Sequence, residues 1–175
     1  MINLQTIVVI AEVKCIRYPM EMRDYYNNYN RLKIGSQQVV RKSAYLEKHA
    51  EEFKKDIGDI KGKTIIKLVI TNYPIFAGCS LDGIPVIDFH WLEGFVTHNK
   101  LIHYLSKNEG GRLVNEPQNA LTLYNNETEF CANFEQQMRS PAIIERFREK
   151  VGTLDIKMTV EDFPFELYLE TATFK

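Results

Sequence analysis

The sequence has few cysteines and no regular spacing between them. Its 175 residues contain three, Cys15, Cys79 and Cys131, an odd number with no Cys-x-x-Cys pair. Neither a zinc site of the usual spacing nor a disulfide framework is therefore indicated. Reduced thiols are the ordinary state of cysteine in the cytosol, so we expect a cytoplasmic protein.

Long apolar runs and a strong net charge are also missing. No run approaches the roughly 18 apolar residues of a membrane helix, and the N-terminus lacks the pattern of a signal peptide, so we expect no membrane partner. The net charge is −1, which gives the whole chain no long-range attraction for nucleic acid. A nuclease remains compatible with this charge, because its basic groups can be local.

The most informative feature is a run of apolar residues at positions 7–14, IVVIAEVK. The run predicts a strand buried on both faces, and the side-chain period of two places Glu12 and Lys14 on one face, with Val13 on the other. Two ionisable groups at the end of a buried strand need pairing, water or a metal. The sequence therefore indicates Glu12 and Lys14 as the main candidates for chemistry, with a solvent-exposed strand end as the plainer interpretation.

The remaining pattern predicts an α/β fold with a small mixed sheet flanked by helices. Apolar spacing favours a helix over residues 33–56, a strand over 63–71, a short strand over 84–87 and a helix over 89–105 capped by Asp88. A loop at residues 108–111 predicts a boundary between a core, 1–107, and a C-terminal extension, 108–175. We expect that extension to contain helices at 127–138 and 141–150 and strands at 154–160 and 165–171, joined by a turn at 161–164.

A polar segment at residues 17–31 has no clear period and is predicted to be a long loop. It interleaves tyrosines with basic residues, and this mixture is typical of surfaces that stack bases and contact phosphates. Arg17, Tyr18 and Arg23 are our candidates for nucleic-acid contacts here. Packing of the aromatic rings on the core or on a partner subunit is the alternative. The tyrosines are Tyr18, Tyr25, Tyr26 and Tyr29, with Arg17, Arg23, Arg31 and Lys33 between or after them.

Residues 5–105 resemble the carboxyl-terminal half of the PD-(D/E)xK nuclease superfamily, whose fold is restriction-endonuclease-like. The resemblance is carried by Glu12-Val13-Lys14 at the end of an apolar strand and by Gln38 on the next helix. Gln38 stands in the run Gly35-Ser36-Gln37-Gln38-Val39-Val40-Arg41-Lys42, where many members of the superfamily carry a Gln-x-x-x-basic or Gln-x-x-basic pattern. The later Val86-Ile87-Asp88 strand with its following helix also resembles the closing element of such proteins.

The resemblance implies a metal-dependent nuclease that cleaves phosphodiesters of DNA or RNA. Glu12 and the backbone carbonyl of Val13 would bind Mg²⁺ or Mn²⁺, which lowers the pKa of a bound water. Lys14 and Gln38 would act as further catalytic residues by orienting that water or neutralising phosphate charge, and Arg41 would contact the nucleic acid.

The chain departs from the family pattern at its N-terminus, because no Asp or Glu precedes Glu12. The Asp-bearing strand of the family is missing, and Glu21 or Asp24 would be an unusual substitute. The missing ligand could come from an upstream portion, a partner chain or a second copy, and an unpaired sheet edge favours self-association. The alternatives are a non-catalytic assembly module that retains the nuclease-like fold, and a small-molecule-binding domain that uses Asp88 and Trp91.

Overall fold

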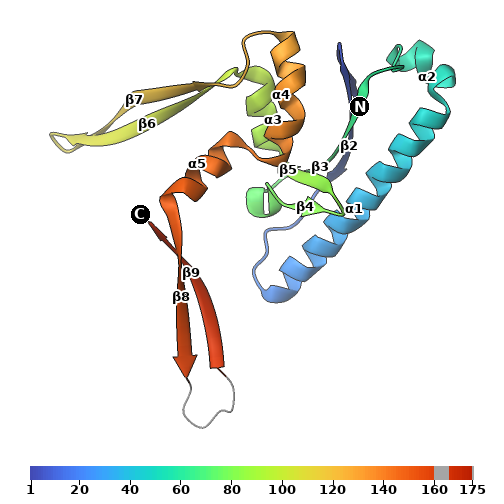
Figure 1. Cartoon of the computed structure of the whole chain (residues 1–175). Helices are drawn as coiled ribbons and strands as arrows, with labels where there is room; N and C mark the ends of the chain where they lie inside the picture. The colour runs from blue at the N-terminus through green and yellow to red at the C-terminus, as the bar shows by residue number, and fades with distance from the viewer. Residues whose placement is uncertain (160–165, 175) are drawn as a thin grey trace. The chain divides into compact units, whose positions relative to one another are not determined.

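A computed structural model describes residues 1–159 and 166–174 (Figure 1). The chain divides into two compact units, Met1–Arg139 and Ser140–Lys175. The boundary predicted between residues 107 and 108 falls inside a β-hairpin of the first unit. Mixed α/β architecture, a mixed sheet and flanking helices are all present, as the sequence predicts.

The first unit is built on a five-stranded sheet in the order β1-β2-β3-β5-β4. The bounds are β1 Ile2–Asn3, β2 Ile7–Lys14, β3 Thr64–Thr71, β4 Ser80–Leu81 and β5 Ile84–Asp88. The three central strands run parallel, and β1 and β4 are antiparallel edges. The predicted strands at 7–14, 63–71 and 84–87 are thereby confirmed, because continuous β-branched runs suit strands that are buried on both faces.

One long helix, α1 (Met22–Lys48), packs against β2 and β3 (Figure 1). Its buried side is continuous with a core that includes Val8 and Ile10 of β2 and Val69 of β3. Alternate residues such as Val9 and Leu68 are buried on the opposite face. That face is covered by α3 (Phe89–Thr97) and α4 (Glu127–Arg139), which pack against β5.

The loop predicted at residues 17–31 is wrong beyond residue 21. Helix α1 already starts at Met22, where Glu21 and Asp24 form a capping box around the first turn. The buried positions of its first turns include the polar Asn28, so the apolar period on which the prediction relied is absent there. The single helix predicted over 33–56 is two helices, since α1 ends at Lys48 and α2 runs from Ala50 to Ile57.

The helix predicted over 89–105 is also too long. Asp88 caps it as expected, accepting a hydrogen bond from the Trp91 backbone N–H at 3.0 Å, but α3 ends at Thr97. The chain continues as a hairpin of β6 (Lys100–Glu109) and β7 (Arg112–Thr122). Gly110 and Gly111 connect the strands, and both have positive φ, 61° and 87°, which a two-residue hairpin turn requires.

The second unit contains α5 (Ala142–Lys150) and a hairpin of β8 (Val151–Thr159) and β9 (Glu166–Phe174). The helices predicted at 127–138 and 141–150 and the two terminal strands are thus present, with both strands longer than expected. The predicted turn at 161–164 lies outside the described residues, as do positions 160 and 165. Within the described part of the chain, no helix is both long and apolar enough to cross a membrane.

Candidate functional site

Strand β2 places Glu12 and Lys14 beside α1. The parallel register pairs Glu12 with Val69 and Lys14 with Thr71 on β3. Along the same face of β2, Val8 and Ile10 are buried in the core against α1. The two ionisable side chains therefore continue an apolar face to the end of the strand, where they meet the helix instead of bulk water.

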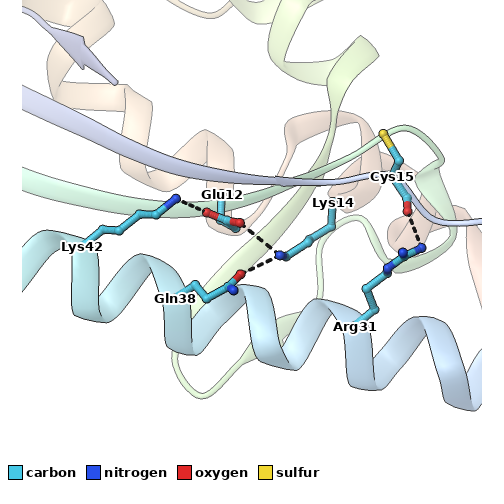
Figure 2. Close-up of polar contacts among 6 residues, drawn as sticks. All are labelled: Glu12, Lys14, Cys15, Arg31, Gln38 and Lys42. Carbon is cyan, nitrogen blue, oxygen red and sulfur yellow. Dashed lines mark hydrogen bonds and ion pairs between the residues drawn. The ribbon is translucent and has the colours of Figure 1, made fainter.

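Four side chains from these two elements form a connected polar cluster (Figure 2). Lys14 Nζ lies 3.0 Å from Glu12 Oε1 and donates a hydrogen bond to Gln38 Oε1 at 2.5 Å. Lys42 Nζ lies 2.5 Å from the other carboxylate oxygen, Glu12 Oε2. The structure thus brings together all three predicted catalytic residues, Glu12, Lys14 and Gln38. We call Glu12, Lys14, Gln38 and Lys42 the Glu12 cluster.

The Glu12 cluster is half-enclosed. The side chains of Glu12 and Lys14 are 14% and 18% exposed, whereas that of Lys42 is 59% exposed. The hydrogen bond from Lys42 is the largest cause that lowers the pKa of Glu12, assisted by Lys14 and opposed by burial. Glu12 is consequently a carboxylate at neutral pH that accepts from two ammonium groups, so the cluster carries one positive charge in excess.

A glycine on α1 makes room for the lysine. A Cβ atom at Gly35 would lie 3.2 Å from both Cγ and Cε of Lys14 and 3.5 Å from Val69 Cγ1. The Lys14 side chain therefore runs across the helix backbone at Gly35 before it reaches Gln38. Close approach of another element is a common reason for a glycine within a helix.

The described residues do not fit a divalent cation. Mg²⁺ takes oxygen ligands from one or two carboxylates together with water and phosphate. Here Glu12 is the one carboxylate of the cluster, and each of its oxygens is held by a lysine ammonium. Across the described ranges, no group of three or more His, Cys, Asp or Glu side chains could hold a metal. A cation at Glu12 would have to displace at least one ammonium group.

The Val13 carbonyl, the other predicted metal ligand, lies on an unpaired edge of β2. The Ile7 carbonyl accepts from Leu4 on the β1 side, whereas the Thr6 carbonyl accepts from Thr64 on the β3 side. Successive carbonyl groups of a strand point to opposite sides, so the carbonyls of Ala11 and Val13 face the β1 side, as that of Ile7 does. Strand β1 pairs only with Val8 and Val9, and no other described strand pairs with this edge.

Glu21 and Asp24 are not substitutes for the missing acidic ligand. Both belong to the first turn of α1, and Asp24 accepts backbone hydrogen bonds from Met20 and Glu21. Glu21 precedes Gln38 by 17 residues, which corresponds to about 25 Å along a helix. Either residue would already be an unusual substitute in the family pattern, and helix α1 carries their carboxylates away from Glu12.

The predicted nucleic-acid contacts are dispersed. Arg41 lies one residue from Lys42 on α1, but Arg23 is near the far end of that helix. Arg17 is exposed, with its carbonyl accepting from Asn28, and the Tyr18 ring packs edge-on against Tyr73 at a centroid distance of 6.0 Å. Of these four residues, only Arg41 lies next to the Glu12 cluster in the sequence of α1.

The tyrosines in the first turns of α1, Tyr25, Tyr26 and Tyr29, lie on a different side of the helix from the cluster. Each residue advances about 100° around a helix, so Tyr29, nine residues before Gln38, is about half a turn away. Arg31 lies on the same side of α1 as the cluster, because it precedes Gln38 by seven residues, which make about two turns. Its Nη1 donates a hydrogen bond to the Cys15 carbonyl at 2.9 Å (Figure 2). The helical period separates aromatic and basic residues that the loop prediction placed together.

No protein-family profile, curated protein or solved structure matches this chain.

Sequence reasoning missed the role of Lys42. The signal was available, because Gln38 and Lys42 are four residues apart and therefore neighbours on one side of a helix. The Gln-x-x-basic pattern directed attention to Arg41 instead. The resemblance points to Gln38, which contacts Lys14, and the four-residue helical period points to Lys42, which contacts Glu12.

Alanine substitution of two helical glycines tests how tightly Lys14 is held. Gly94 on α3 has open space around a new Cβ atom, and we expect Gly94→Ala to raise the free energy of unfolding by about 0.5–1 kcal/mol. Gly35→Ala should gain less or lose stability, because its Cβ meets Lys14. Urea unfolding of both variants measures the difference. Equal stabilisation would show that Lys14 moves aside freely.

Proposed function

We propose that this chain is a nuclease-like domain whose Glu12 cluster binds a phosphodiester group of DNA or RNA. The observation that carries the proposal is the convergence of two lysine ammonium groups on a single half-enclosed carboxylate. One carboxylate orients both cations without neutralising both. The remaining positive charge can attract a phosphate, and Arg41 adds a further cation beside it.

The chain's own residues have separable tasks in this proposal. Lys42, the most exposed member, is the first to reach a phosphate oxygen. Gln38 accepts from Lys14 and fixes the direction of that ammonium group. Preorganised charges of this kind stabilise developing negative charge more than mobile ones do, because they need not reorient during the reaction.

Hydrolysis is the proposed reaction class, on the strength of the resemblance to PD-(D/E)xK nucleases in Glu12, Lys14 and Gln38. The described residues supply one carboxylate, so cleavage should need a second acidic group from a partner chain, a second copy or a longer form of the protein. We therefore expect the chain alone to bind nucleic acid more readily than it cleaves it.

A non-catalytic assembly module is the second candidate. It is favoured by the observation that both oxygens of Glu12 are already paired with lysines, as in a structural ion-pair network. The unpaired edge of β2 would then be the surface that joins a partner, since such edges readily accept another strand.

The test measures binding and cleavage separately, using labelled DNA and RNA. In EDTA, we expect Lys42→Ala to lower the slope of log affinity against log salt by about 1, as loss of one phosphate contact does. Lys48→Ala, at an exposed lysine near the end of α1, should leave the slope unchanged. Glu12→Gln should strengthen binding because it removes a negative charge.

Cleavage is assayed with Mg²⁺ or Mn²⁺ added to the same proteins. Any cleavage by the wild type should disappear in Glu12→Gln, although this variant binds more tightly. Opposite effects on binding and cleavage would separate a catalytic carboxylate from a structural one. Folded wild type with no salt-dependent binding would overturn the proposal and leave the assembly module.

A further inference from the structure

An open hollow of about 660 Å³ adjoins the Glu12 cluster. Its volume falls within the range of small-molecule sites, about 300–1,000 Å³. Gln38 and Lys42 of the cluster line it, so the hollow and the cluster share a wall on α1. Ile10, Leu46 and Phe53 provide apolar lining.

The hollow combines cationic and aromatic groups in one place. Arg41 and Lys42 lie in its wall, and Tyr45 follows Lys42 by three residues, about one turn of α1. The Tyr45 ring stacks on His49 at a centroid distance of 4.3 Å and packs edge-on against Phe53 at 6.0 Å. These contacts steady the ring, yet Tyr45 remains 56% exposed.

We infer that this hollow is a nucleotide subsite, in which Tyr45 stacks a base and Lys42 with Arg41 holds the attached phosphate. The inference rests on the proposed function, because it places in the hollow the nucleotide that is attached to the phosphate bound at the Glu12 cluster. Two features support a nucleotide over a simple anion. The hollow offers an aromatic ring for the base, and it is also lined by an amide, Gln38, which accepts from Lys14.

The substrate class follows from the stacking. A base that lies against Tyr45 cannot at the same time stack within a duplex, so the strand must be single or frayed at this point. The preferred ligand is therefore single-stranded nucleic acid or the end of a duplex. Stacking accepts every base, so little sequence preference is expected.

Binding of single-stranded and blunt duplex oligonucleotides in EDTA tests the inference. Tyr45→Ala and Tyr45→Leu should both weaken single-strand binding roughly 5- to 150-fold, the range for loss of one stacked base. Tyr45→Phe, which keeps the ring, should bind within about twofold of wild type. Tyr26→Ala is the matched control, because Tyr26 is 66% exposed on the same helix but remote from the hollow.

Amide NMR spectra locate the ligand. Thymidine monophosphate should shift the Ala11, Arg41 and Tyr45 signals, whereas inorganic phosphate at equal concentration should shift Arg41 and leave Ala11 and Tyr45 unchanged. Unaltered single-strand affinity in Tyr45→Ala, with the Lys42 effect intact, would overturn the subsite and leave the proposed function standing. Loss of the Lys42 effect as well would overturn both. Signal shifts caused by an extended acidic peptide, and not by the nucleotide, would overturn the nucleotide subsite. They would show that the hollow binds a peptide in the β-strand conformation.

Discussion

Replacing Glu12 with alanine is expected to lower the free energy of unfolding at pH 7 by about 2–3 kcal/mol. Among the described residues, the change leaves the half-enclosed Lys14 ammonium with Gln38 as its remaining partner. Removal of one member of a fully buried ion pair costs about 3–5 kcal/mol, and the partial exposure and the remaining hydrogen bond reduce that figure. Urea unfolding measures it.

Two controls separate the buried charge from the loss of contacts. Lys42→Ala removes an exposed partner of the same carboxylate and should cost less than about 1 kcal/mol. The double variant Glu12→Leu with Lys14→Met replaces both charges by apolar groups and should recover most of the lost stability. A Glu12→Ala protein more stable than wild type would show that the cluster is strained and kept for its activity.

The stabilising effect of the Glu12 carboxylate should depend on pH. Because the pKa of Glu12 is lowered in the folded protein, with the Lys42 hydrogen bond as its first cause, its stabilising effect is fully present above the unfolded-state value of 4.5. The effect is lost as the pH falls below 4.5 through the lowered pKa. The stability difference between wild type and Glu12→Gln should therefore shrink with acidification.

Phe95→Ala is expected to have the largest effect on the fold, a loss of about 3–5 kcal/mol. Phe95 is 1% exposed and stands at the centre of an aromatic cluster that joins α3 to α4. Its ring lies 5.1 Å from Phe130, 5.3 Å from Tyr124 and 5.8 Å from Phe134. Aromatic pairs at such distances add stabilisation beyond the area they bury.

The control for this prediction is a neighbour on the same helix. Phe89 is exposed at the start of α3, and its replacement by alanine should change stability by less than about 0.5 kcal/mol. Thermal unfolding of both variants gives the comparison. Similar losses at the two positions would mean that α3 is held by its termini, and that the aromatic cluster contributes little.

The features predicted correctly from the sequence are those that depend on buried strands and on local residue spacing. The run at residues 7–14 forms β2 with the expected ends, and the period of two correctly places Glu12 and Lys14 on one face of it. Gln38 was expected beside Lys14 only from the resemblance, and it accepts a hydrogen bond from Lys14. Strand faces are robust predictions because a shift by one residue would expose the whole apolar set. The positions of Glu12 and Lys14 in the cluster were therefore predictable from the strand pattern.

The errors in the predicted elements arose where tertiary contacts or special backbone geometry determine the secondary structure. The first turns of α1 bury Asn28, whose amide donates to the Arg17 carbonyl, and no apolar period reveals such a helix. The β6–β7 hairpin depends on the positive φ angles of Gly110 and Gly111. The sequence predicts a loop at this pair, and the structure makes the pair the two-residue turn of a hairpin.

The pairing between β1 and β2 is short, and this affects how readily copies of the chain associate. Strand β1 leaves the β2 backbone beyond Val9 open among the described residues, and an open apolar edge promotes strand addition between molecules. Charged side chains on such a strand oppose this association. Glu12 and Lys14 lie on this strand, so variants that neutralise both require a check of their association state before lost activity is attributed to chemistry.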